Sequence, residues 1–106
     1  MRDYVFVETI APAAAGDPRL LRDAVKVLAT GSATVTVALL EGAVLGAVLD
    51  HPVFTTLSEA GAVIGVDALS LEQWGYDASD VPGRELVTMD WLLERLLDDN
   101  STVVWH

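Results

Sequence analysis

Residues 62–77, AVIGVDALSLEQWGYD, change within a few positions from the pattern of a buried strand to that of a helix. The first half is apolar except for Asp67 and predicts a strand. The second half predicts a short helix that starts at Ser70, which has capping-box spacing with Gln73, and ends at Gly75. In open α/β proteins, ligands and catalytic groups gather where strands end. Asp67 is therefore the first candidate functional residue.

The same alternation of strand and helix patterns runs along the chain. Strands are expected at 3–10, 33–40, 62–69, 85–88 and 101–106, and helices at 18–29, 43–49, 53–61, 70–75 and 89–99. Strands that alternate with helices form parallel sheets covered on both faces. The predicted fold class is α/β: a doubly wound, mostly parallel five-stranded sheet with helices on both faces, in one domain spanning residues 1–106.

Two helices carry apolar faces that we expect to pack against this sheet. Asp17 is the expected N-cap of the first helix and Pro18 its first residue. The inward face of that helix is predicted to comprise Leu20, Leu21, Ala24, Val25 and Leu28. The inward face of the last helix is predicted to comprise Leu92, Leu93, Leu96 and Leu97.

The composition restricts the classes of partner. The chain has 106 residues, with 16 acidic and 6 basic side chains and a formal charge of −10. This charge repels phosphate backbones and anionic lipid surfaces, so we expect neither a nucleic-acid nor a membrane partner. The N-terminal residues do not follow the pattern of a secretory signal, and a cytoplasmic location is predicted.

Several kinds of chemistry find no support in the sequence. The chain has no cysteine, which excludes disulfides, thiolate metal sites and a cysteine nucleophile. No glycine-rich phosphate loop follows a strand, and no nucleophile elbow is present. A phosphoacceptor site is disfavoured because Glu8 stands alone in the first strand and the only lysine, Lys26, lies on the first helix. His51, beside Pro52, is most simply a helix-start residue, and neither a metal nor a cofactor is predicted.

Aromatic residues suggest a contact surface. Trp91 and Trp105 are expected to pack in the core or at an interface. Trp74 and Tyr76 flank Gly75 after the short helix, where full burial is harder. Both are therefore candidates for a subunit interface.

Three segments, taken in order, resemble parts of one known family. VALLEGAVLGAV (37–48) is similar to a strand followed by a small helix, SEAGAVIGVDALSLEQWGY (58–76) to a strand and short helix, and MDWLLERLLDDNSTVVWH (89–106) to a final helix and closing strand. The order and spacing of these segments resemble the DsrE/DsrF/DsrH family, which includes the TusB, TusC and TusD components of sulfur relay. The similarity extends over nearly the whole chain.

The resemblance implies a DsrE-like fold and assembly as homo-oligomers, often trimers or hexamers, or as hetero-oligomers with DsrE/DsrF-like relatives. For the catalytic branch it implies a persulfide on a cysteine near the end of the third strand. Counted back from Gly75, that position falls on Asp67. A carboxylate cannot carry sulfur as a thiolate does, so this chain by itself cannot perform the transfer step. It resembles the cysteine-poor DsrH/TusB-like subunits instead.

The leading hypothesis is thus a non-catalytic, oligomer-forming subunit or interaction protein related to sulfur relay. An alternative is a small-molecule-binding protein with a strand-end pocket formed by Asp67, Ser70, Glu41, Glu8 and His51. In the first case Asp67 caps or orders the following helix, and in the second it contacts a ligand. An acid–base enzyme would need a second carboxylate that the sequence does not identify.

Overall fold

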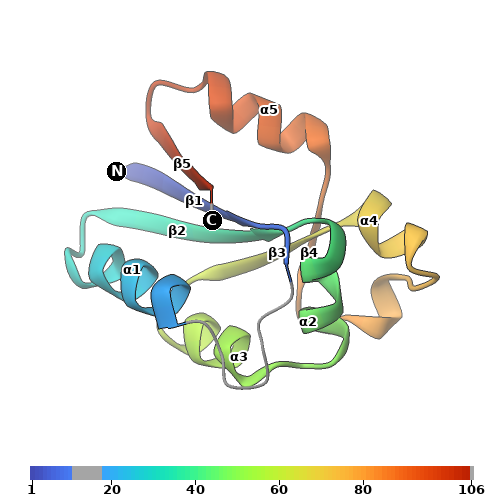
Figure 1. Cartoon of the computed structure of the whole chain (residues 1–106). Helices are drawn as coiled ribbons and strands as arrows, with labels where there is room; N and C mark the ends of the chain where they lie inside the picture. Colours follow the sequence, from blue (N-terminus) through green and yellow to red (C-terminus); the bar gives the residue numbers. More distant parts are fainter. Residues whose placement is uncertain (11–17, 106) are drawn as a thin grey trace.

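A five-stranded parallel sheet organises the computed structural model, which describes residues 1–10 and 18–105 (Figure 1). The strands are β1 (Arg2–Glu8), β2 (Ala33–Leu39), β3 (Val63–Asp67), β4 (Glu85–Val87) and β5 (Ser101–Trp105). Their order in the sheet is β4-β3-β2-β1-β5, and each neighbouring pair is parallel. The first strand is thus interior, with the last strand beside it. The predicted α/β fold class is confirmed.

Helices cover both faces of the sheet (Figure 1). On one face lie α1 (Pro18–Ala29), α2 (Val44–Val48) and α3 (Pro52–Glu59), and on the other lies α5 (Met89–Leu97). The short α4 (Ala68–Gln73) follows β3 directly at the edge where the strands end. Single 3₁₀ turns, η1 (Glu41–Ala43) and η2 (Ala78–Asp80), follow β2 and α4. The polar segment between α4 and β4 therefore contains one helical turn.

The larger core lies between the sheet and the three-helix face. Side chains of β1, β2 and β3 that point to this face, such as Phe6, Val37 and Ile64, pack against Phe54 and Leu57 of α3. All of these side chains are buried. Alternate strand residues supply this core because successive side chains of a strand point to opposite faces.

The face of α1 differs from its prediction at one residue. Leu20 and Ala24 are buried as expected, but Val25 is 42% exposed, and Val27 packs against the core instead. At about 100° per residue, Val25 lies about 100° from Ala24 around the helix, whereas Val27 lies within about 60° of it. The helix starts at Pro18 as predicted. The predicted cap, Asp17, lies outside the described residues.

The smaller core lies beneath α5, where the prediction for the last helix is largely wrong. Leu92 is 2% exposed and packs with Val5, Val7, Ala38 and Leu40. The other predicted inward residues are exposed: Leu93 (48%), Leu96 (47%) and Leu97 (86%). Within the residues that the structure describes, α5 is the only helix on this face, so only the line of residues nearest the sheet is covered.

Pairing with β1 makes β5 the edge strand of the sheet on the side opposite β4. Asp3 of β1 is in register with Ser101 of β5, and Val7 is in register with Trp105. Arg95 of α5 forms an ion pair with Asp3, with its Nε 3.2 Å from Oδ2. The guanidinium of Arg95 also lies over the ring of Trp91, 5.0 Å from its centroid. The first strand and the last helix–strand unit are therefore held together by both charge and packing.

Candidate functional site

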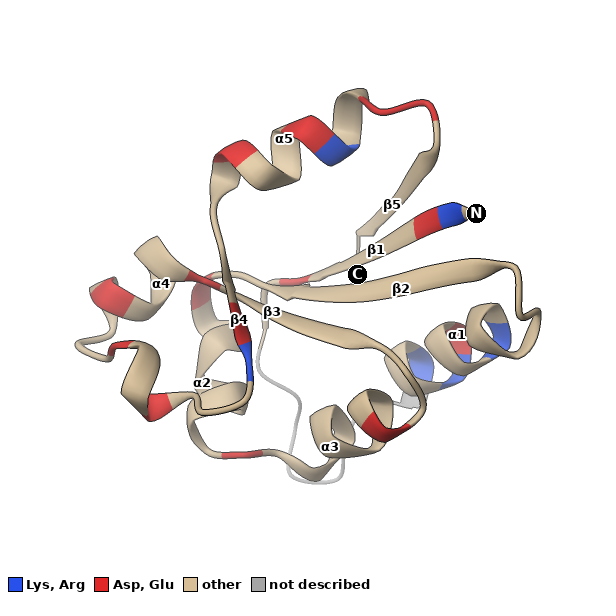
Figure 2. Ribbon diagram, turned by 180° about the vertical axis from the view of Figure 1, so that it is seen from behind, with Lys and Arg blue, Asp and Glu red and all other residues tan. Residues whose placement is uncertain are grey.

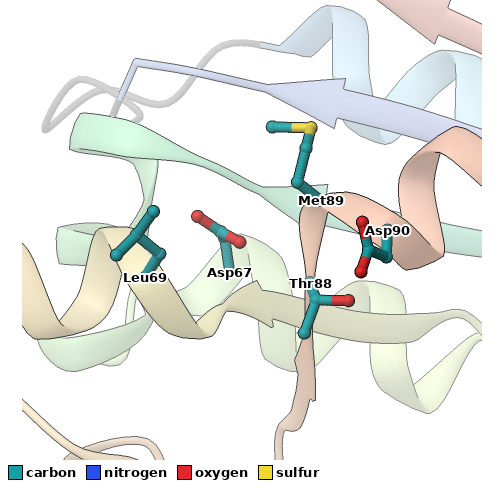
Figure 3. A pocket seen from close by; sticks show the side chains of 5 residues that line it. All are labelled: Asp67, Leu69, Thr88, Met89 and Asp90. Atoms are coloured by element: carbon teal, nitrogen blue, oxygen red, sulfur yellow. The ribbon is translucent and has the colours of Figure 1, made fainter.

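A pocket of about 250 Å³ opens where β3 and β4 end. Asp67, Leu69, Thr88, Met89 and Asp90 line it (Figure 3). Asp67 is the last residue of β3, and Thr88 directly follows β4. Because the two strands are parallel neighbours, their carboxyl ends bring these side chains to the same edge. The pocket lining contains two carboxylates and no basic side chain.

Asp67 caps α4. Its side chain is buried, and its Oδ2 accepts hydrogen bonds from the backbone N–H of Ser70 (3.0 Å) and from the Ser70 hydroxyl (2.6 Å). The predicted capping box led by Ser70 is therefore wrong, because α4 begins at Ala68 and Asp67 is its N-cap. No loop separates β3 from α4, so the last strand residue, still extended at φ −64° and ψ 118°, takes the capping position. The helix ends before Gly75, which has the expected positive φ of 85°.

A chain of hydrogen bonds connects this cap to the segment after β2. The Ser70 hydroxyl oxygen accepts from the backbone N–H of Glu41 at 2.9 Å. The carbonyl of Glu41 accepts from the indole N–H of Trp74 at 3.2 Å. Glu41 itself has a φ of 51°, in the left-handed region. The structure therefore brings Asp67, Ser70 and Glu41 together, but Ser70 and Glu41 support the capping residue and do not line the pocket.

The other two predicted pocket residues lie apart from it. Glu8 ends β1, and its carbonyl accepts a hydrogen bond from the backbone N–H of Leu40 at 2.9 Å. His51 caps α3: its Nδ1 accepts from the backbone N–H of Val53 at 3.1 Å, and its ring packs edge-on against Phe54. The helix-start interpretation of His51 is confirmed. Neither residue lines the pocket.

Sequence reasoning missed four of the five lining residues. Leu69 is the second residue of the helix that Asp67 caps, and Thr88 caps α5 by accepting from the backbone N–H of Trp91 at 3.2 Å. Met89 and Asp90 form the first turn of α5. One signal was available: a polar residue, Asp67 or Thr88, lies at or near the end of each of these two predicted strands. Only the pairing of β3 with β4 shows that these two ends meet.

Two further candidate residues lie outside the lining of this pocket. Trp74 and Tyr76 are 51% and 36% exposed, as expected of interface candidates, and their role stays a prediction. No cluster of three or more His, Asp or Glu side chains is placed to hold a metal ion among the described residues. Across 1–10 and 18–105, every helix is too short or too polar to cross a membrane.

Comparison with known proteins identifies the architecture. No family model and no curated protein matches the sequence. Among solved structures, the chain is similar to the crystal structure of the YchN protein from E. coli, with a TM-score of 0.72 over 100% of both chains. The fold is the one seen in YchN. At 16% sequence identity this likeness concerns the fold and agrees with the DsrE-like architecture expected from the sequence.

Proposed function

We propose that this chain is a non-catalytic, oligomer-forming subunit or interaction protein related to sulfur relay. The observation that carries the proposal is a fold shared with YchN over the full length of both chains, in a sequence with no cysteine. Persulfide transfer requires a thiolate, so this chain would contribute structure or contacts to an assembly whose sulfur-carrying cysteine lies elsewhere. A cytoplasmic location and DsrE/DsrF-like partners are part of the same proposal.

The state of Asp67 supports this interpretation. The family resemblance assigns the sulfur-carrying position to Asp67, and here the side chain is buried with Oδ2 occupied by both donors of Ser70. A carboxylate in this position stabilises the start of α4, which is a structural task. The local fold of a transfer site would thus be retained without its reactive group.

Measurement of the assembly tests the proposal. We expect size-exclusion chromatography with light scattering at micromolar concentration to give a mass several times the 11.3 kDa of one chain, as for a trimer or hexamer. Purification from the native host would show whether a relative accompanies the chain. A strictly monomeric protein with no co-purifying relative would contradict the proposal.

A second candidate function is favoured by the pocket itself. Asp67 at the end of β3 and Asp90 in the first turn of α5 both line it, and no basic side chain does. We propose that this pocket binds a small organic cation such as an amine, because carboxylates accept charge-assisted hydrogen bonds from ammonium groups. The same fold would then serve as a binding protein.

Thermal shift with putrescine as the first probe tests this second function. A bound ligand should raise the melting temperature of the natural chain. Asp67→Asn keeps an oxygen for the Ser70 cap but removes the charge, so the shift should fall in this variant and in Asp90→Asn. Glu59→Gln removes one charge from an exposed residue of α3 and is the matched control. If the shift in melting temperature were equal in all three variants, putrescine would act through the net charge of the protein and not through this pocket.

A further inference from the structure

An uncovered apolar surface lies along α5 and β5. Its members are large apolar side chains that are about half exposed or more: Met89 (50%), Leu93 (48%), Leu96 (47%), Leu97 (86%) and Trp105 (55%). We name this set the α5–β5 surface. Its four helical members recur at spacings of four, three and one residues, the pattern of a helix face that contacts an apolar partner. In this molecule that partner is not the sheet, because Leu92 occupies the sheet-facing position.

The five side chains lie on one side of the molecule. At about 100° per residue, Met89, Leu93 and Leu96 lie on one flank of α5, and Arg95 lies on the other. Arg95 pairs with Asp3, whose Oδ1 accepts from the Thr34 hydroxyl of β2 at 2.9 Å. The Arg95 flank of α5 therefore lies toward β2. Since β5 lies on the other side of β1 from β2, the opposite, apolar flank of α5 faces the β5 edge.

Trp105 extends this flank onto the sheet. It is in register with Val7, so both side chains point to the same face, and Val7 is buried beneath α5. Figure 1 shows β5 running under α5 at the edge of the sheet. The apolar flank of α5 and the indole of Trp105 therefore adjoin along one edge.

The β5 edge lacks the protection that the opposite edge has. β4 is three residues long, carries Glu85, and follows Arg84 and Pro82. β5 is five residues long, STVVW, with no charged residue and no proline (Figure 2). Edge strands are normally kept from pairing by charges, proline or shortness, and β5 has none of these. In the described part of the chain β5 pairs only with β1, so its other side can pair with another strand.

The exposed apolar area and the absence of charged members in the α5–β5 surface favour a second copy of the same chain as the occupant. Two copies that each carry a charge of −10 repel one another, so their contact must be made by uncharged surface, as here. The α5–β5 surface exposes on the order of 500 Å² of apolar area, near the top of the range for monomers. A stable interface buries about 800 Å² per partner. Pairing of the β5 edges would add to the area that the five apolar side chains bury.

We infer that two copies of this chain associate through the α5–β5 surface about a two-fold axis, with their β5 edges paired antiparallel. The inference rests on the proposed oligomeric function and specifies its contact. A two-fold axis places the same apolar stripe on both sides, so each copy covers the exposed leucines of the other. Three such pairs would give a hexamer.

Sedimentation of the purified full chain tests the inference, with Leu93→Glu as the variant. Leu86→Glu is the matched control, since Leu86 is 47% exposed and lies on the opposite edge strand. We expect Leu93→Glu to raise the dissociation constant of the pair about tenfold or more, whereas Leu86→Glu leaves it unchanged. Both side chains are half exposed, so circular dichroism should show a folded protein in each case.

Salt dependence gives a second measurement. Salt screens the repulsion between two acidic copies, so the dissociation constant of the pair should fall when NaCl is raised from about 0.05 to 0.5 M. These concentrations are chosen because the Debye length changes roughly threefold between them. An even-numbered assembly that dissociates with Leu93→Glu and tightens with salt supports the inference. A trimer, or an assembly that Leu93→Glu leaves intact, overturns this contact but keeps the proposed function. A monomer under all conditions overturns both.

Discussion

The two faces of the sheet bury their apolar residues to very different extents. Three helices cover one face, and side chains such as Phe54 and Leu57 are almost completely enclosed there. One helix covers the other face, and of its four predicted inward leucines only Leu92 is buried. Adjacent helices cover one another's flanks on the first face, and α5 has no such neighbour in the described part of the chain. Burial is therefore decided by the number of helices that share a face as well as by helical periodicity.

The largest effect should come from the three-helix face. Leu57→Ala removes a fully enclosed side chain, whose relative exposure is 0%. We expect the free energy of unfolding to fall by about 4 kcal/mol, because helices packed on all sides leave a cavity that cannot collapse. Urea denaturation followed by circular dichroism measures this loss. A loss below about 2 kcal/mol would mean that this core is looser than its burial indicates.

The same substitution under α5 should cost less. Leu92 is 2% exposed, so Leu92→Ala removes the same atoms from a nearly equal degree of burial. The half-exposed neighbours on α5 have room to move inward, and we expect a loss of about 2–3 kcal/mol, the low end for such a change. Comparison of the two urea midpoints in one buffer measures the difference. Equal losses of unfolding free energy for Leu57→Ala and Leu92→Ala would contradict the proposed difference between the two faces.

The cap at the strand end should contribute less than either core. Asp67→Ala removes the acceptor of two hydrogen bonds from Ser70 and should lower the free energy of unfolding by about 1–2 kcal/mol. Asp67→Asn keeps an acceptor oxygen and should lose less than half as much. Thermal and urea unfolding of both variants would check the order. If Asn and Ala were equally damaging, the charge rather than the cap would stabilise α4.

The smallest effect is expected at an exposed leucine of α5. Leu93→Ser changes a side chain that is 48% exposed and should shift the free energy of unfolding of the single chain by no more than about 0.5 kcal/mol. The measurement requires dilute protein, where association does not contribute. A larger loss at high dilution would show that Leu93 packs within its own chain, and the comparison of faces would need revision.

Much of this fold follows from local patterns, and the failures have particular causes. The strands and helices follow from runs and periodicities that short-range sterics and burial impose. The helical pattern predicts Leu93, Leu96 and Leu97 on the inward face because it shows which residues are apolar, but it does not show whether another element covers them. Ser70 was placed as the cap because the sequence does not show that β3 enters α4 without a loop.

The candidate site was predictable only at one of its two strand ends. Asp67 stood out because a buried strand ends with a lone acid. Asp90 and Thr88 are ordinary first-turn and capping residues of a helix, and their place beside Asp67 depends on the pairing of β3 with β4. Strand order is a long-range property, and in this chain no local signal specified it.

The pairing of β1 with β5 has a consequence for folding during synthesis. Asp3 cannot pair with Ser101 until the ribosome has added that residue, roughly 5–20 s later at common elongation rates. Until then Val5 and Val7 lack the cover of Leu92, and β1 is itself an open edge. We therefore expect docking of the α5–β5 unit to be the final step, and the nascent chain to be most prone to aggregation just before it.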